Sequence, residues 1–269
     1  MKDKEKKERQ EKMEKKIIFF DIDGTLIDMN IHKVSERVLE TLRQLKRNGF
    51  LLGISTGRSP VLLPKIDGIT FDFFITFNGS YCYNDKEEIF SNAILREDVK
   101  VFLENAAKMN RPLSVATKTR VAANGWDDDL ATYYSFGNTK LVVADDFDVV
   151  KEDEIYQFML ACKPEEYDQL LQGTVNCKVA TWWDRAADII PKDGGKGQGI
   201  AHVLEYYGLT KEQAIAFGDG NNDIEMMGAV GTSIAMGNAS DELKSISTEV
   251  CEDVSEDGIY HACKRHGWI

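Results

Sequence analysis

The sequence predicts an α/β protein with a parallel-sheet core and a second, inserted α+β domain. Three observations support this prediction. Apolar strand-like segments alternate with amphipathic helical segments over the first third of the chain, this order breaks in the middle, and it returns near the last third. We therefore expect residues 17–90 and 188–269 to form the core, residues 91–187 to form the inserted domain, and residues 1–16 to be a charged N-terminal extension.

The first half of the core begins with residues 17–20, a short run that is apolar on both faces, as expected of a central parallel strand. An amphipathic helix should follow, because Ser35 is a suitable N-cap and Gly49 can end the helix. Residues 50–55 and 71–77 are predicted to be two further buried strands, with a short helix that starts at a proline between them. Strand, helix, strand, helix, strand is the order of an open parallel sheet.

The middle of the chain has a different pattern, in which short strands face each other across tight turns. Residues 81–83 and 87–90 flank an Asn-Asp-Lys turn and predict a β-hairpin. The next segments predict a helix at residues 96–110 and strands at 113–117, 120–124 and 154–162. A helix at 165–172 and a strand at 177–183 should follow. The α/β order then returns, with helices predicted at 199–208 and 257–267 and strands beginning near residues 213 and 231.

The composition excludes several classes of function. A net charge of −12 argues against a general nucleic-acid-binding or anionic-membrane surface, because such binding depends on an excess of Lys and Arg. The five cysteines form no C-x-x-C motif, so neither a zinc site nor a redox pair is indicated. No segment approaches the ~18 apolar residues of a membrane span, and the charged start lacks the apolar region of a secretory signal. We expect a cytoplasmic protein that is a monomer or a small homo-oligomer.

Polar clusters follow three predicted strands, at "DIDGT", "STGR" and "GDGNND", and a glycine-rich "GGKGQG" segment carries a lysine. In an open parallel sheet, ligands bind beyond the carboxyl ends of the strands, so these clusters should meet there. Asp21 and Asp23 lie two positions apart and can face one cavity, and Asp219 adds a carboxylate from a distant segment. Carboxylates this close repel each other unless a cation lies between them, and an oxygen-only ligand set suits Mg²⁺.

The four motifs, in this order, resemble those of the haloacid dehalogenase superfamily, specifically the Cof-type sugar phosphatases with a C2 cap. The resemblance covers nearly the whole chain after residue 16. It implies a Rossmann-like core, with residues 91–187 as a C2-type α+β cap domain. Asp21 would be the nucleophile that forms an aspartyl-phosphate, and Asp23 the general acid and then the general base. Mg²⁺ would bind the Asp21 carboxylate, the Asp23 backbone carbonyl and Asp219.

The resemblance also implies a phosphate cradle. Thr56 and the backbone N–H of Gly57 would donate hydrogen bonds to phosphoryl oxygens, and Lys196 would provide positive charge. Asn222 would contact the phosphate side, and Asp223 would support the metal site or Lys196. Arg58 would meet either the phosphate or the body of the substrate.

Simpler roles stay open for single residues. Asp23 and Thr56 could be helix caps, Asp219 a turn residue, and Lys196 a surface lysine. Asn78, after the third strand, could form a tight turn or line the cavity.

For the substrate we expect a small phosphorylated metabolite, with hexose or pentose phosphates first and pyridoxal phosphate or flavin mononucleotide as alternatives. Trp126 and Trp182 could contact its leaving group or pack inside the cap. A phosphomutase is disfavoured because only about thirty residues separate Asp23 from Thr56, which leaves little room for a helical cap. A phosphoacceptor signalling domain would be much shorter, and a non-catalytic sugar-phosphate-binding protein would not need Asp21, Asp23 and Lys196 together.

Overall fold

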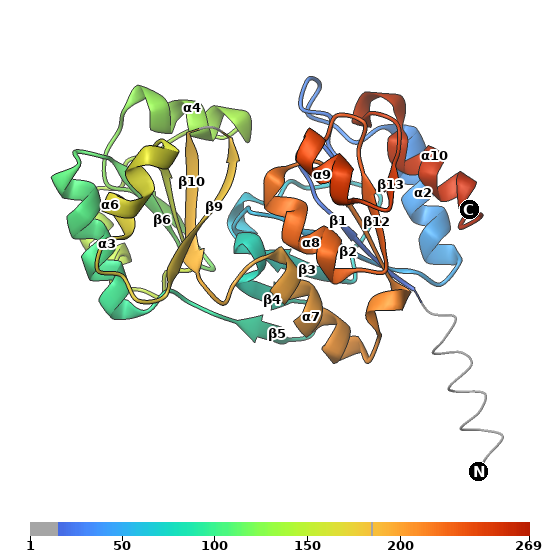
Figure 1. Cartoon of the computed structure of the whole chain (residues 1–269), viewed down its shortest axis with the longest axis horizontal. Coiled ribbons are helices and arrows are strands. Elements are labelled where there is room, and N and C mark those ends of the chain that lie inside the picture. Colours follow the sequence, from blue (N-terminus) through green and yellow to red (C-terminus); the bar gives the residue numbers. More distant parts are fainter. Residues whose placement is uncertain (1–15, 184) are drawn as a thin grey trace, which may run out of the picture.

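The computed structural model describes residues 16–183 and 185–269, so the predicted charged extension at residues 1–16 lies almost wholly outside the described residues. The chain forms two lobes (Figure 1). One contains an eight-stranded sheet built from both ends of the chain, and the other contains a five-stranded sheet from the middle of the chain. Among the described residues, none of the helices has the length and apolar character needed to cross a membrane.

The core sheet has the order β13-β12-β11-β1-β2-β3-β4-β5. Its first six strands in this order are parallel, and β4 and β5 add an antiparallel hairpin at the edge, as predicted. The strand bounds are β1 (Ile17–Phe20), β2 (Leu51–Ser55), β3 (Phe73–Thr76), β4 (Tyr81–Tyr83), β5 (Glu88–Ser91), β11 (Ala214–Gly218), β12 (Thr232–Ala235) and β13 (Glu249–Val250).

Strand β1 lies at the centre of this sheet, between β11 and β2. Its residues alternate between the two faces, because side chains of a strand point to opposite sides in turn. Ile18 and Phe20 pack in one hydrophobic cluster, whereas Ile17 and Phe19 pack in the other. This explains why the run is apolar throughout.

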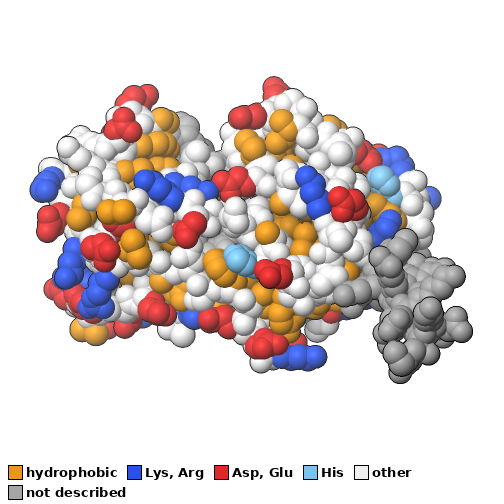
Figure 2. All heavy atoms as spheres, turned by 60° about the horizontal axis from the view of Figure 1, so that its bottom comes forward, with side chains coloured by type: hydrophobic (Ala, Val, Ile, Leu, Met, Phe, Trp, Pro, Cys, Tyr) orange, Lys and Arg blue, Asp and Glu red, His pale blue; other side chains and the backbone are white. Residues whose placement is uncertain are grey.

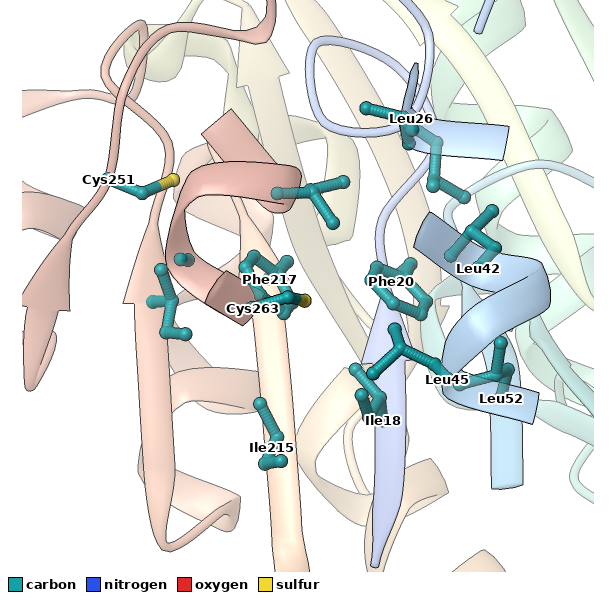
Figure 3. Close-up of a cluster of buried hydrophobic side chains, with 14 of the residues drawn as sticks. Ile18, Phe20, Leu26, Leu42, Leu45, Leu52, Ile215, Phe217, Cys251 and Cys263 are labelled. Atoms are coloured by element: carbon teal, nitrogen blue, oxygen red, sulfur yellow. The ribbon is translucent and has the colours of Figure 1, made fainter. Parts of the chain in front are cut away.

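Helices cover both faces of the core sheet (Figure 1). On one side, α2 and α10 pack over Phe20 and over Phe217 of β11, and Figure 3 shows Leu42 and Leu45 of α2 close to the Phe20 ring. On the other side, α7 and α8 supply the buried residues that meet Ile17 and Phe19. The helix bounds are α2 (Glu36–Arg47), α7 (Lys196–Tyr207), α8 (Ile224–Ala229), α9 (Asp241–Ile246) and α10 (Gly258–Arg265).

Helix α2 shows the predicted start and stop signals. The Ser35 hydroxyl accepts a hydrogen bond from the Val38 amide at 3.1 Å, which satisfies one of the free N–H groups of the first turn. Gly49 follows the C-cap with a φ of +87°, a conformation that glycine adopts without steric cost.

The second lobe is an antiparallel sheet with the order β7-β6-β8-β10-β9. Residues of α3 and α6 pack on one face, and α4 packs on the other, over Met159 of β8. The bounds are β6 (Leu113–Ala116), β7 (Val121–Ala123), β8 (Gln157–Ala161), β9 (Cys177–Trp183), β10 (Ala186–Pro191), α3 (Arg96–Lys108), α4 (Asp128–Phe136), α5 (Phe147–Val150) and α6 (Tyr167–Leu171).

Three elements of this lobe differ from the sequence-based expectation, namely β10, α4 and the short helix α5. Strand β10 was not predicted, and its Ile189 pairs with Phe158 of β8. The expected domain boundary between residues 187 and 188 therefore falls inside a strand of the second lobe. The five-stranded sheet continues to Pro191. Helix α4 was not predicted either, although the Asp127 side chain caps it by accepting a hydrogen bond from the Leu130 amide.

Candidate active site

A cavity of about 510 Å³ lies where the carboxyl ends of the core strands face the second lobe. The surface is also hollowed between the two lobes, as Figure 2 shows. Asp21 follows β1 directly, and its amide donates a hydrogen bond to the Phe217 carbonyl at 3.0 Å, which ties it to the neighbouring strand β11. Asp219 follows β11, and Thr56 follows β2. Parallel pairing of β2, β1 and β11 thus brings residues from both halves of the chain to one edge.

Lys196, the first residue of α7, lies buried among these acids. Its ammonium nitrogen is 2.6 Å from Asp21 Oδ1 and 2.6 Å from Asp223 Oδ1. The lysine side chain is 0% exposed, so these two carboxylates supply the compensation that a buried charge requires. The simpler interpretation of Lys196 as a surface lysine is therefore wrong.

The buried charges shift the pKa values of this cluster. Removal from water raises the pKa of Asp21 to about 7, although the nearby Lys196 ammonium acts in the opposite direction. Burial disfavours the charged form of Lys196, but Asp21 and Asp223 outweigh this effect and raise the lysine pKa above its ordinary value. Lys196 therefore stays charged at neutral pH.

The remaining acids of the cluster have different surroundings. Asp223 accepts hydrogen bonds from the amides of Asp219 and Gly220, at 3.0 and 3.1 Å, in addition to the one from Lys196. Asp219 accepts a hydrogen bond from the Thr25 hydroxyl at 2.8 Å. Burial, together with the charges of Asp21 and Asp223, holds the pKa of Asp219 well above its usual range. The Asp223 carboxylate thus accepts hydrogen bonds from Lys196 and two backbone amides, whereas the Asp219 carboxylate accepts the one from Thr25.

This donor set fits a hard divalent cation. One ligand oxygen from each of Asp21, Asp219 and Asp223 lies within 4.8 Å of the others. Burial, followed by the charges of neighbouring acids, raises the pKa values of Asp21 and Asp219, and a cation between the carboxylates would offset that cost. Mg²⁺ prefers such carboxylate oxygens and completes its shell with water.

Asp23 and Arg58 both line the same cavity and form a two-point ion pair. Arg58 Nε donates to Asp23 Oδ2 and Arg58 Nη2 donates to Asp23 Oδ1, both at 2.7 Å. Arg58 also donates to the carbonyls of Leu62 in the core, at 3.0 Å, and of Gly137 in the second lobe, at 3.3 Å. The sequence had assigned Arg58 to the phosphate or the substrate body, but its acidic partner in the structure is Asp23.

Three further residues of the predicted phosphate cradle line the cavity, namely Thr56, Gly57 and Asn222. The Thr56 hydroxyl accepts a hydrogen bond from the Arg58 amide at 3.2 Å, which fixes the local turn, whereas the N-cap position of the next short helix belongs to Ser59 and not to Thr56. The Asn222 side chain donates to Asn78 Oδ1 at 3.3 Å.

Asn78 forms the expected turn but is not among the described residues that line the cavity. It sits in a turn with a φ of +50°, and its side chain reaches across to the second lobe. Its amide nitrogen donates to Gln157 Oε1 at 3.2 Å and to Asp188 Oδ2 at 3.1 Å. Gln157 in turn donates to the Gly57 carbonyl at 3.1 Å. These contacts hold the second lobe over the core beside Gly57.

Sequence reasoning missed the polar residues on the second lobe. Asp188 of β10 is buried, lines the cavity, and accepts a hydrogen bond from the Tyr133 hydroxyl. Burial raises the pKa of Asp188 to about 7, although hydrogen bonds from Tyr133 and Asn78 act against this. One signal could have indicated it: a lone aspartate in the apolar run "AADIIP" must be buried with partners or face a site.

The two tryptophans have different positions. Trp182 of β9 lines the cavity. Trp126 is 60% exposed, and it neither lines the cavity nor packs inside the cap. Both expected roles, contact with the leaving group and packing inside the cap, are therefore wrong for Trp126.

This combination of a parallel sheet, a carboxylate and lysine cluster at its edge, and a covering second lobe defines a capped phosphoryl-transfer enzyme. Residues 18–263 match the family of haloacid dehalogenase-like hydrolases, and the chain belongs to this family. It is a Cof-type phosphatase within the family.

Two relatives from Bacillus subtilis (strain 168) are similar over almost their full length. The protein named "Putative phosphatase YkrA" is 32% identical over 259 residues, which is 96% of this chain and 100% of that protein. The 5-amino-6-(5-phospho-D-ribitylamino)uracil phosphatase YitU is 27% identical, over 93% of this chain and 97% of the relative.

Two solved structures share the fold and the arrangement of both lobes. The HAD subclass IIB sugar phosphatase BT4131 aligns with a TM-score of 0.85 and 29% identity, over 94% of this chain and 100% of the other. The phosphatase BT1666 from Bacteroides thetaiotaomicron aligns with a TM-score of 0.86 and 27% identity, over 94% of this chain and 96% of the other.

Proposed function

We propose that this phosphatase is Mg²⁺-dependent and hydrolyses small phosphomonoesters through an aspartyl-phosphate formed on Asp21. The observation that carries the proposal is the convergence of Asp21, Lys196 and Asp219 at one edge of the sheet. Lys196 contacts Asp21 at 2.6 Å, and Asp219 contributes a carboxylate to the same acidic group. A carboxylate nucleophile needs positive charge close to it, because it must approach an anionic phosphoryl group without repelling it.

In the first step, an Asp21 oxygen bonds to phosphorus and the ester P–O bond breaks. Asp23, which lines the same cavity, gives a proton to the leaving alcohol. In the second step, water attacks phosphorus, the bond to Asp21 breaks, and Asp23 takes a proton from the water. Mg²⁺, held by Asp21, Asp219 and the Asp23 backbone carbonyl, would screen the charge of the transferring phosphoryl group.

The other residues of the site would hold the phosphoryl group in place. The Thr56 hydroxyl, the Gly57 amide and Asn222 line the cavity and are suited to donate hydrogen bonds to its oxygens. Lys196 supplies the fixed positive charge, and Asp223 fixes Lys196 through a second 2.6 Å contact. Arg58 would orient Asp23 through their two hydrogen bonds.

The similarity of this chain to known phosphatases supports two classes of substrate. Hexose and pentose phosphates are supported by the similarity to the sugar phosphatase BT4131. Phosphates of a ring-bearing alcohol, such as pyridoxal phosphate or flavin mononucleotide, are the second class, and the relative YitU is named for a substrate that carries a uracil ring. The cavity of about 510 Å³ limits either class to small molecules.

The test is phosphate release from a panel of monoesters with added Mg²⁺, after removal of metal with a chelator, and for Asp21→Asn. We expect turnover that requires Mg²⁺ and is lost in Asp21→Asn, while calorimetry still detects ligand binding to this variant. Full turnover without metal would overturn the Mg²⁺ requirement. Full activity of Asp21→Asn would show that Asp21 is not the nucleophile, and binding without any turnover in the wild type would favour a non-catalytic binding protein.

A further inference from the structure

The part of the cavity contributed by the second lobe is mostly aromatic. Tyr133, Tyr134 and Phe136 of α4 line it together with Trp182 of β9. The Trp182 ring meets Tyr133 edge to face at a centroid distance of 5.1 Å, and Phe136 at 5.6 Å with an interplanar angle of 86°. These four residues, which we call the aromatic wall, offer flat apolar surface on the side of the cavity that the second lobe contributes.

Two hydroxyl groups on this side already donate their hydrogens within the protein. The Tyr133 hydroxyl donates to Asp188, and the Thr139 hydroxyl donates to the Tyr134 carbonyl at 3.1 Å. A sugar oxygen bound beside them would have to displace one of these hydrogen bonds or receive none from these two hydroxyls. A hydroxyl buried without a partner costs free energy, so the wall disfavours a polyol relative to an apolar ring.

The charges around the cavity disfavour a second anionic group. Asp28, Asp188 and Asp253 line it in addition to the catalytic acids. Among the described lining residues, the cationic side chain is that of Arg58, and its guanidinium is already paired with Asp23. A leaving group that carries its own phosphate or carboxylate would meet like charges, whereas a neutral or cationic ring would not.

We propose that the aromatic wall is the leaving-group subsite, and that it selects monophosphate esters whose alcohol carries a flat, neutral or cationic ring over sugar phosphates. This inference rests on the proposed phosphomonoester hydrolysis and narrows its substrate class. The ring of the leaving group lies against Trp182 and Phe136, while the phosphoryl group points toward Asp21 and Lys196.

Three substrates test this preference, since all are phosphate esters of primary alcohols with a six-membered ring: benzyl phosphate, cyclohexylmethyl phosphate and glucose 6-phosphate. Their leaving groups have rings of the same size that differ in flatness and polarity. With Mg²⁺, we expect kcat/KM to be highest for benzyl phosphate and lowest for glucose 6-phosphate. Each ring contact contributes on the order of a few-fold to tenfold, as is usual for aromatic pairs.

Two substitutions link the preference to the wall. Phe136→Ala and Trp182→Ala should each lower kcat/KM for benzyl phosphate several-fold and leave that for glucose 6-phosphate nearly unchanged. Phe136 is 40% exposed, so its truncation should not prevent folding. Trp126→Ala is the matched control, because Trp126 lies on the same lobe, is 60% exposed and does not line the cavity. It should keep the wild-type ratio between the two substrates.

The outcomes separate this inference from the proposed function. Equal or faster hydrolysis of glucose 6-phosphate, or an unchanged substrate ratio in Phe136→Ala and Trp182→Ala, would overturn the subsite and leave the phosphatase mechanism intact. If the wild type hydrolyses none of the three esters, the proposed function fails for this substrate size. In that case, calorimetry of benzyl phosphate and glucose 6-phosphate binding tests the subsite alone. We expect benzyl phosphate to bind more tightly, and equal or weaker binding of benzyl phosphate would contradict the inference.

Discussion

Lys196 offers a quantitative test of the buried acid cluster through the substitution Lys196→Met. The side chain is 0% exposed and contacts Asp21 and Asp223 at 2.6 Å each. Methionine fills a similar volume but leaves two buried carboxylates without their cation. Removal of one partner from a buried ion pair typically costs about 3–5 kcal/mol, so we expect a loss of this size in the free energy of unfolding.

The same substitution should act on catalysis. Asp21 has a pKa of about 7 even though Lys196 lowers it, so the loss of the ammonium should raise this pKa further and protonate the nucleophile at neutral pH. The phosphoryl group would also lose its fixed cation. We expect kcat to fall by about 10²-fold or more.

Urea unfolding in the absence of Mg²⁺ measures the loss of stability. Lys178→Met is the matched control, because Lys178 pairs with Glu225 at 2.8 Å but both side chains are partly exposed, at 28% and 51%. Such a surface pair contributes about 0–1 kcal/mol. Adding Asp223→Asn to Lys196→Met removes one of the orphaned charges and should restore part of the stability. A loss below about 1 kcal/mol for Lys196→Met would refute the account of a charge-compensated cluster.

Two further predictions concern Asp188 and Gly24. Burial raises the pKa of Asp188 from 3.8 to about 7. The stability of the wild type therefore falls as the pH rises between these two values, because the carboxylate must then ionise while it is buried. Relative to wild type, Asp188→Asn should therefore gain about 2 kcal/mol in urea unfolding between about pH 5.5 and pH 7.5, and a constant difference would contradict this. A Cβ at Gly24 would lie 2.3 Å from Asp219 Oδ2, at a φ of +84°. Gly24→Ala should cost about 1–2 kcal/mol and raise the Mg²⁺ concentration needed for half-maximal activity, and an unchanged Mg²⁺ titration would speak against Asp219 as a ligand.

Much of the core could be predicted because its signals are local. The apolar run of β1 ends at Asp21, the Ser35 hydroxyl caps α2, and Gly49 ends that helix, each as the sequence indicates. The meeting of Asp21 with Asp219 also followed from sequence, since the carboxyl ends of parallel strands share one edge of a sheet.

The second lobe was harder to predict because its determinants are distant in sequence. β10 contains Asp188, a residue type depleted in strands, and this carboxylate is tolerated because Tyr133 and Asn78 donate hydrogen bonds to it. Helix α4 contains Thr, Tyr and Phe residues that favour strands, so the pattern obscured its cap at Asp127.

The pairing of Arg58 with Asp23 depends on a turn of the chain after β2, which no local signal encodes. From the sequence we expected Arg58 to meet the phosphate or the body of the substrate, and nothing indicated Asp23 as its partner. The structure shows that its guanidinium reaches Asp23, Leu62 and Gly137, in both lobes.

Mass spectrometry of the enzyme quenched in acid during turnover tests the central claim most directly. With Mg²⁺ and a hydrolysable monoester, we expect one added phosphoryl group in the peptide that contains residues 17–28, located on Asp21. Reduction with borohydride should convert that aspartyl-phosphate to homoserine at the same position. A phosphoryl group on another residue, or sustained turnover with no phosphorylated enzyme and no reduction product at Asp21, would contradict the account.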